Sequence, residues 1–155
     1  IRLKNKAGQE DETTKKNKQL LRELVYKRME ENLIEEKALD MTIEASGGVF
    51  RTLVDMITSA SSYSRLYGGN RIDVQDITQA LNEERANKKR ALNRVSYEIL
   101  SEIYAHKRLL DTDKEEALMM LHGLFALEYM NGEEWCDVHP LLVSEIEEYK
   151  KIEKR

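Results

Sequence analysis

The chain has 155 residues, of which 41% are apolar and 35% are charged, and its net charge is -4 at pH 7. This balance predicts a globular protein with a core, and no apolar run approaches the roughly 20 residues that a bilayer-spanning helix needs. The single cysteine, Cys136, cannot form an internal disulfide. We therefore expect a cytoplasmic chain with no membrane contact. Its length suits one sizeable domain or two small ones.

Residues 1–12 are polar after a short apolar start, and the first residue is Ile1. We therefore expect this chain to be the C-terminal part of a longer protein.

Four helices are predicted in the first half of the chain, because apolar side chains recur there at the 3.6-residue period. Glycine runs and an Asp-x-x-Asp motif, which is suited to capping a helix, separate or open these helices. The expected helices are Thr13–Leu33, Glu35–Ala45, one from Ser46 to about Tyr67, and one that begins at Asp73.

The net charge is unevenly distributed along the chain. Residues 1–84 and 109–155 are both acidic, whereas residues 85–108 are basic. The apolar pattern also stops near Glu83, so we place a boundary between two modules there. The predicted division is a helical bundle at 13–84, a basic linker or helix extension at 85–94, and a second module at 95–155.

The second module is predicted to hold two helices, a β-hairpin and a final helix that begins at Pro140. One helix ends near Lys107, and a nearly all-round apolar helix follows a capping box at Thr112–Glu115. Asn131-Gly132 lies between two short strand-like runs and is the preferred central pair of a type I′ hairpin. The expected fold class is therefore mainly α, with one short β-hairpin.

The first half contains the runs Ser46-Gly47-Gly48-Val49-Phe50-Arg51 and Arg71-Ile72-Asp73-Val74. With these runs it resembles the lid subdomain of AAA+ ATPases, and the resemblance covers about half of the chain. In that family a glycine pair opens the third lid helix, and an arginine in its first turns is the sensor-2 residue. The resemblance implies that Arg51 senses the γ-phosphate of ATP, with Gly47 and Gly48 shaping its approach.

The second half resembles the terminal module of a group of poorly characterised prokaryotic P-loop ATPases, through Leu127-Glu128-Tyr129 and the run from Asn131 to Leu141. A lid followed by a winged helix is also the order found in origin-initiator ATPases. The resemblance implies a four-helix lid bundle, then a winged helix. It also implies an upstream ATPase core that binds ATP and magnesium.

The sequence departs from the complete family pattern in two ways. It contains no Gly-x-x-x-x-Gly-Lys-Ser/Thr loop and no strand ending in paired acids, so this chain alone is not expected to bind or hydrolyse ATP. Only one clear helix lies between Lys107 and the hairpin, where a winged helix has two. A short extra helix within 109–113 would complete the pattern.

Each candidate site also has a structural interpretation. Arg51 could be an ordinary surface arginine. The basic residues could contact nucleic acid, although a solvated linker is favoured because the predicted recognition helix carries no Arg, Asn or Gln for base contacts. These basic residues are Arg85, Lys88, Lys89, Arg90 and Arg94, with Lys107 and Arg108 further along.

The remaining candidates are better explained by packing. His106, His122 and His139 are too widely separated to suggest a metal site, and Tyr129 and Trp135 are expected to pack the wing against its core. No metal is therefore expected in this chain.

The sequence thus favours a regulatory fragment of an AAA+ ATPase whose winged helix relays the nucleotide state to a protein partner. Two alternatives stay open. One is a DNA-binding winged-helix regulator whose N-terminal part dimerises, and the other is a protein-interaction module with no nucleotide role.

Overall fold

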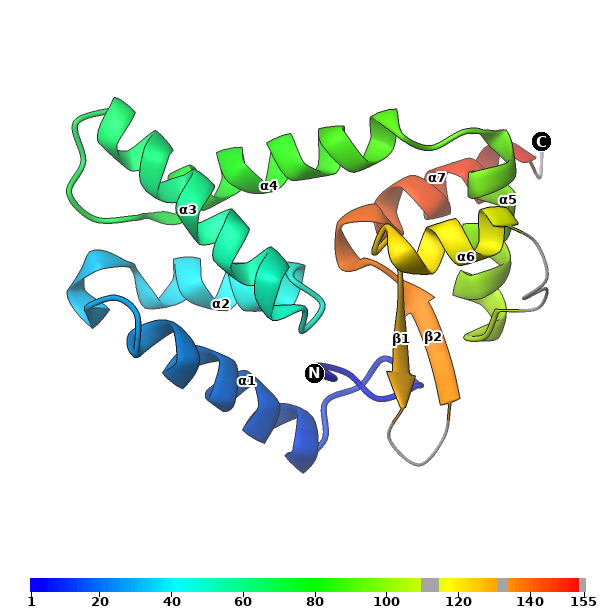
Figure 1. Ribbon diagram of the computed structural model, residues 1–155, viewed down its shortest axis with the longest axis horizontal. Helices are drawn as coiled ribbons and strands as arrows, with labels where there is room; N and C mark the ends of the chain where they lie inside the picture. The colour runs from blue at the N-terminus through cyan, green and yellow to red at the C-terminus, as the bar shows by residue number, and fades with distance from the viewer. Residues whose placement is uncertain (110–114, 131–133, 154–155) are drawn as a thin grey trace. The chain divides into compact units, whose positions relative to one another are not determined.

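The computed structural model describes residues 1–109, 115–130 and 134–153, which divide into two compact units. Unit 1 is Ile1–Glu84 and unit 2 is Arg85–Arg155. The described part is mainly helical with one two-stranded antiparallel sheet, as the sequence predicts (Figure 1). None of the described helices combines the length and the apolar character needed to cross a membrane.

Unit 1 is built from helices that follow one another through short connections (Figure 1). Its elements are α1 Glu12–Tyr26, the 3-10 turn η1 Glu31–Leu33, α2 Glu36–Ala45, α3 Phe50–Leu66 and the first part of α4 Val74–Arg90.

The first helix is shorter than predicted, since α1 ends at Tyr26 and not at Leu33. The reason is a pairing between distant segments: the Ile72 nitrogen donates to the Leu33 carbonyl at 2.8 Å, and the Glu35 nitrogen donates to the Ile72 carbonyl at 2.9 Å. Residues 34 and 35, which follow the 3-10 turn, therefore run extended beside Ile72 and cannot continue a helix. Leu33 lies at helical spacing from the apolar residues of α1, and this spacing gives no sign of the backbone pairing with Ile72.

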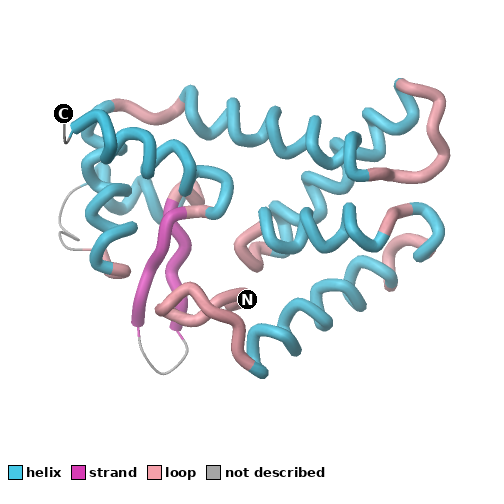
Figure 2. The backbone as a smooth tube through the Cα atoms, turned by 180° about the vertical axis from the view of Figure 1, so that it is seen from behind, coloured by secondary structure: helices cyan, strands magenta, loops and turns pink. Residues whose placement is uncertain are grey.

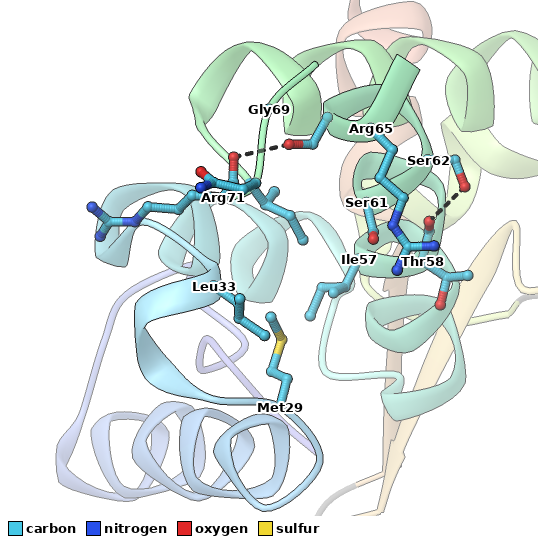
Figure 3. Close-up of a pocket in the computed structure, with 12 residues that line it drawn as sticks. Met29, Leu33, Ile57, Thr58, Ser61, Ser62, Arg65, Gly69 and Arg71 are labelled. Carbon is cyan, nitrogen blue, oxygen red and sulfur yellow. Dashed lines mark hydrogen bonds between the residues drawn. The ribbon is translucent and has the colours of Figure 1, made fainter. Parts of the chain in front are cut away.

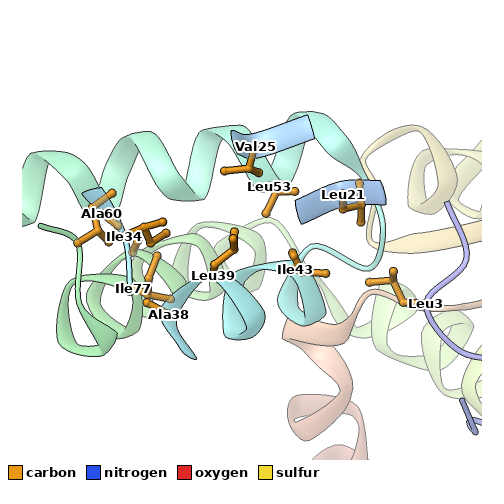
Figure 4. Close-up of a cluster of buried hydrophobic side chains, with 12 residues drawn as sticks. Leu3, Leu21, Val25, Ile34, Ala38, Leu39, Ile43, Leu53, Ala60 and Ile77 are labelled. Atoms are coloured by element: carbon orange, nitrogen blue, oxygen red, sulfur yellow. The ribbon is translucent and has the colours of Figure 1, made fainter. Parts of the chain in front are cut away.

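Aliphatic side chains of the four helices, together with Leu3, Ile34 and Ile72 outside them, form the core of unit 1 (Figure 4). Burial of each large aliphatic side chain contributes roughly 1.5–3 kcal/mol. The fully buried members include Leu21 of α1, Leu39 and Ile43 of α2, Leu53 of α3 and Ile77 of α4.

The ends of α3 and α4 follow local rules that the sequence reveals. Gly68 adopts a left-handed conformation after α3, and Gly69 donates to the Ser64 carbonyl at 2.8 Å, which makes a Schellman end. The predicted cap of α4 is confirmed, because Asp73 Oδ1 accepts from the nitrogens of Gln75 and Asp76.

Unit 2 begins within α4, which continues through residues 85–90 to Arg90. The following elements are α5 Arg94–His106, α6 Glu115–His122, β1 Ala126–Met130, β2 Glu134–Val138, the 3-10 turn η2 Pro140–Leu142 and α7 Val143–Glu153. Pro140 thus opens a 3-10 turn that leads into the last helix, rather than the helix itself.

The two strands lie side by side in antiparallel register, with Glu128 opposite Cys136 and Tyr129 opposite Trp135 (Figure 2). The predicted turn at Asn131-Gly132, the capping residue Thr112 and the possible helix within 109–113 fall wholly or mainly outside the described residues.

The apolar helix predicted after the capping box is too long, because its apolar pattern from Leu118 to Leu127 predicts one continuous helix. Helix α6 ends at His122, because Leu124 takes a left-handed conformation and the Phe125 nitrogen donates to the Met120 carbonyl. Leu127 belongs to β1 instead. With about two turns, α6 buries only one side, so Met119 is 57% exposed.

Candidate functional site

The turn between α2 and α3 is built by the predicted serine and glycine pair. Gly47 has φ +61° and Gly48 has φ +84°, a region in which side chains other than glycine are strained. Ser46 does not cap α3 as expected. Its buried hydroxyl donates to the Ile43 carbonyl at 2.7 Å and accepts from the Gly48 nitrogen at 3.1 Å, so it braces the turn.

The first residues of the chain lie directly over this turn. The Ile1 nitrogen donates to the Gly48 carbonyl at 3.1 Å, and Leu3 is buried in the core of unit 1. A β-carbon on Gly48 would lie 1.7 Å from the Ile1 carbonyl oxygen, so only glycine permits this approach. Residues 1–3 are therefore held beside the beginning of α3.

Arg51 lies in the first turn of α3, and its side chain is exposed. Within the described part of the chain it has no ion pair and no hydrogen bond. The N-cap residue Val49 supplies no side-chain acceptor to the helix start. The exposed guanidinium and the amide groups of the first turn are both suited to an anion.

A second arginine at this place was not identified from the sequence. The Arg28 guanidinium lies 5.1 Å from the centroid of the Phe50 ring, and Phe50 directly precedes Arg51 in α3. Arg28 follows the end of α1, whereas the predicted helix Thr13–Leu33 would have included it. No local pattern could have joined two arginines that are 23 residues apart.

Most of the predicted nucleic-acid residues bond within unit 2. The Arg85 Nε donates to the Leu141 carbonyl at 3.2 Å. Lys88 Nζ donates to the Leu124 carbonyl at 3.2 Å and lies 5.2 Å from the centroid of the Phe125 ring. These two side chains therefore link the last turns of α4 to η2 and to the segment between α6 and β1.

The other three predicted basic residues have polar partners in the same unit. These contacts are the ion pairs of Lys89 with Glu145 at 2.6 Å and of Arg94 with Glu98 at 3.0 Å, and the hydrogen bond of Arg90 to Asn87. Lys107 behaves similarly, since it pairs with Asp137 at 2.7 Å. Nucleic-acid contact by these residues stays a prediction.

The exposed side of α6 carries acidic and apolar side chains. Glu115, Glu116, Leu118 and Met119 are all exposed, so the helix offers no guanidinium or amide to a base edge. Tyr129 and Trp135 stack on each other with ring centroids 4.4 Å apart, and Trp135 is 6% exposed. The two rings therefore stack on each other across the strand pair, whereas packing of the pair against the core of unit 2 stays a prediction.

His139 is fully buried and precedes η2, where its Nδ1 accepts from the Leu141 nitrogen at 3.3 Å. Burial, with a smaller contribution from Lys88, lowers the pKa of His139 to about 3. Its Nε2 has no hydrogen-bond partner among the described residues. Within the same residues, no group of three or more His, Cys, Asp and Glu side chains could hold a metal ion.

Unit 1 also contains a surface cleft that the sequence did not predict. The cleft has a volume of about 400 Å³ and lies between the α1–η1 connection, the second half of α3 and the α3–α4 loop (Figure 3). Its charged lining residues are Arg65 and Arg71.

In comparisons with known proteins, no family model, no curated protein and no solved structure matches this chain.

Proposed function

We propose that unit 1 is the nucleotide-sensing lid of a larger P-loop ATPase of the AAA+ class, and that Arg51 contacts the γ-phosphate. The observation that carries the proposal is the exposed Arg51, which has no partner within the described residues, directly after a left-handed glycine turn.

The chemistry follows from charge and geometry. Phosphate oxygens accept hydrogen bonds from helix N-terminal amides, and a guanidinium can bind two of them at once. ATP and magnesium would be held by an ATPase core upstream of Ile1. Residues 1–3 lie beside the first turn of α3, so that core would be tethered close to Arg51. ATP would then favour a closed lid through its additional phosphate.

Unit 2 fits the role of a winged helix that relays the nucleotide state. Its helices are followed by an antiparallel strand pair, and the Lys107 carbonyl accepts from the Cys136 nitrogen at 3.0 Å. The segment after α5 therefore meets β2 where a winged helix has its third strand. The exposed Leu118 and Met119 of α6 suit a protein surface better than a phosphate backbone.

A protein-interaction module without a nucleotide role is the second candidate, because these exposed side chains of α6 do not depend on ATP. A DNA-binding regulator has less support, since the basic side chains of α4 and α5 make contacts within unit 2.

The first test is the ATP turnover of the protein together with its upstream segments. Arg51→Ala is expected to lower turnover about ten-fold or more, because a charge-assisted hydrogen bond to the transferring phosphate contributes about 1.5–3 kcal/mol. The turnover of Arg51→Lys should lie between that of the parent protein and that of Arg51→Ala, since a lysine keeps the charge but loses the planar guanidinium.

Lys16→Ala removes an exposed cation from α1 and serves as the control. Equal turnover in the parent protein and in Arg51→Ala would refute the sensing role.

A further inference from the structure

The floor of the cleft in unit 1 is apolar although the cleft is open to solvent. Met29, Leu33 and Ile57 point toward one another across it, and the buried Ile72 adds to the same lining (Figure 3). Leu33 is 40% exposed. An aliphatic side chain from a partner would remove this surface from water.

The rim of the cleft is polar and positively charged. Arg65 descends from α3 beside Ser61 and Thr58, whereas the Arg71 side chain turns outward (Figure 3). Arg71 Nη2 donates to the Ile34 carbonyl at 3.4 Å. The Arg65 side chain has no ion pair or hydrogen bond within the described residues, so its guanidinium is available to a carboxylate.

Apolar surface continues along the chain beyond Arg65. Leu66 and Tyr67 are each 73% exposed, and they immediately precede Gly68-Gly69, of which Gly69 lines the cleft. Exposed apolar surface is one of the features that mark protein-contact sites.

We propose that this cleft binds an acidic peptide segment of a partner protein. An aliphatic side chain of the segment fills the floor formed by Met29, Leu33 and Ile57, and a neighbouring carboxylate pairs with Arg65. The charge argument selects the occupant, because both charged lining residues are arginines. The cleft is open, since most of its lining residues are exposed, whereas small-molecule sites enclose most of their ligand.

This proposal does not rest on the nucleotide role of Arg51, and the two can fail separately. The test is selection from a displayed library of random peptides on the immobilised protein, followed by synthesis and titration of the enriched sequences. We expect enrichment of aliphatic residues next to Asp or Glu. Arg65→Glu should weaken binding of the selected peptide about ten-fold or more, because it replaces an attraction by a repulsion.

Two further variants identify the site. Leu33→Ser should weaken the same peptide several-fold through the loss of apolar contact, and Lys16→Glu on α1 should leave its affinity unchanged although it makes the same charge reversal. Selection of no peptide above background, selection of basic peptides, or equal affinity of the parent protein and Arg65→Glu would each overturn the proposal.

Discussion

Replacement of Gly48 by alanine is expected to lower the free energy of unfolding of unit 1 by about 3 kcal/mol. A left-handed conformation costs a residue with a β-carbon roughly 1–2 kcal/mol, and a forced backbone displacement adds about 1–3 kcal/mol. Both costs apply here, because φ is +84° and the new β-carbon would lie 1.7 Å from the Ile1 carbonyl oxygen. Urea unfolding followed by circular dichroism measures the loss.

Gly68→Ala is the matched control. Gly68 has φ +77° but no atom within 4 Å of the added β-carbon, so only the conformational cost of roughly 1–2 kcal/mol applies. Equal losses in the two variants would show that residues 1–3 do not press on the glycine turn. Faster hydrogen exchange at residues 1–3 in Gly48→Ala, but not in Gly68→Ala, would show where the strain is relieved.

Unit 2 is expected to lose stability as the pH falls from 6.5 toward 3. Burial, with a smaller contribution from Lys88, lowers the pKa of His139 from 6.5 to about 3 in the folded state. The unfolded chain therefore binds a proton in this window that the folded chain does not, and stability falls with decreasing pH. Between pH 7 and pH 5 the expected loss from His139 is about 2 kcal/mol.

The single tryptophan makes this measurement specific, because Trp135 lies in unit 2 and its fluorescence reports the unfolding of that unit. His139→Asn is the control, since its side-chain oxygen can still accept from the Leu141 nitrogen but does not titrate. The variant should lose most of the pH dependence between 5 and 7. An identical pH dependence in both proteins would contradict the assignment to His139.

Much of the fold follows from local rules in the sequence. Amphipathic periodicity predicts the helical class, Asp73 predicts the start of α4, and the glycine pair predicts the turn before α3. These features depend on interactions between residues that are near in sequence. Helix α1 was predicted too long because the backbone of residues 33–35 pairs with Ile72, and such a long-range contact leaves no periodic signal.

The candidate sites also differ in whether local sequence or long-range contacts determine them. The resemblance to AAA+ lids predicted Arg51 as a candidate, whereas Arg28 is placed near the beginning of α3 by its contact with Phe50, which the sequence does not predict. The cleft could not have been predicted, since its lining comes from segments around 29–33, 57–65 and 69–72. Only the fold brings Arg65 and Arg71 to the rim of one apolar cleft.

The central claim is that Arg51 detects the third phosphate of ATP, and the ratio of ATP to ADP affinity tests it most directly. Competition against a fluorescent nucleotide on the protein with its upstream segments gives both affinities. Arg51→Ala should weaken ATP about ten-fold and leave ADP nearly unchanged, because the lost hydrogen bonds involve the γ-phosphate alone. An unchanged ratio of the two affinities would contradict the claim.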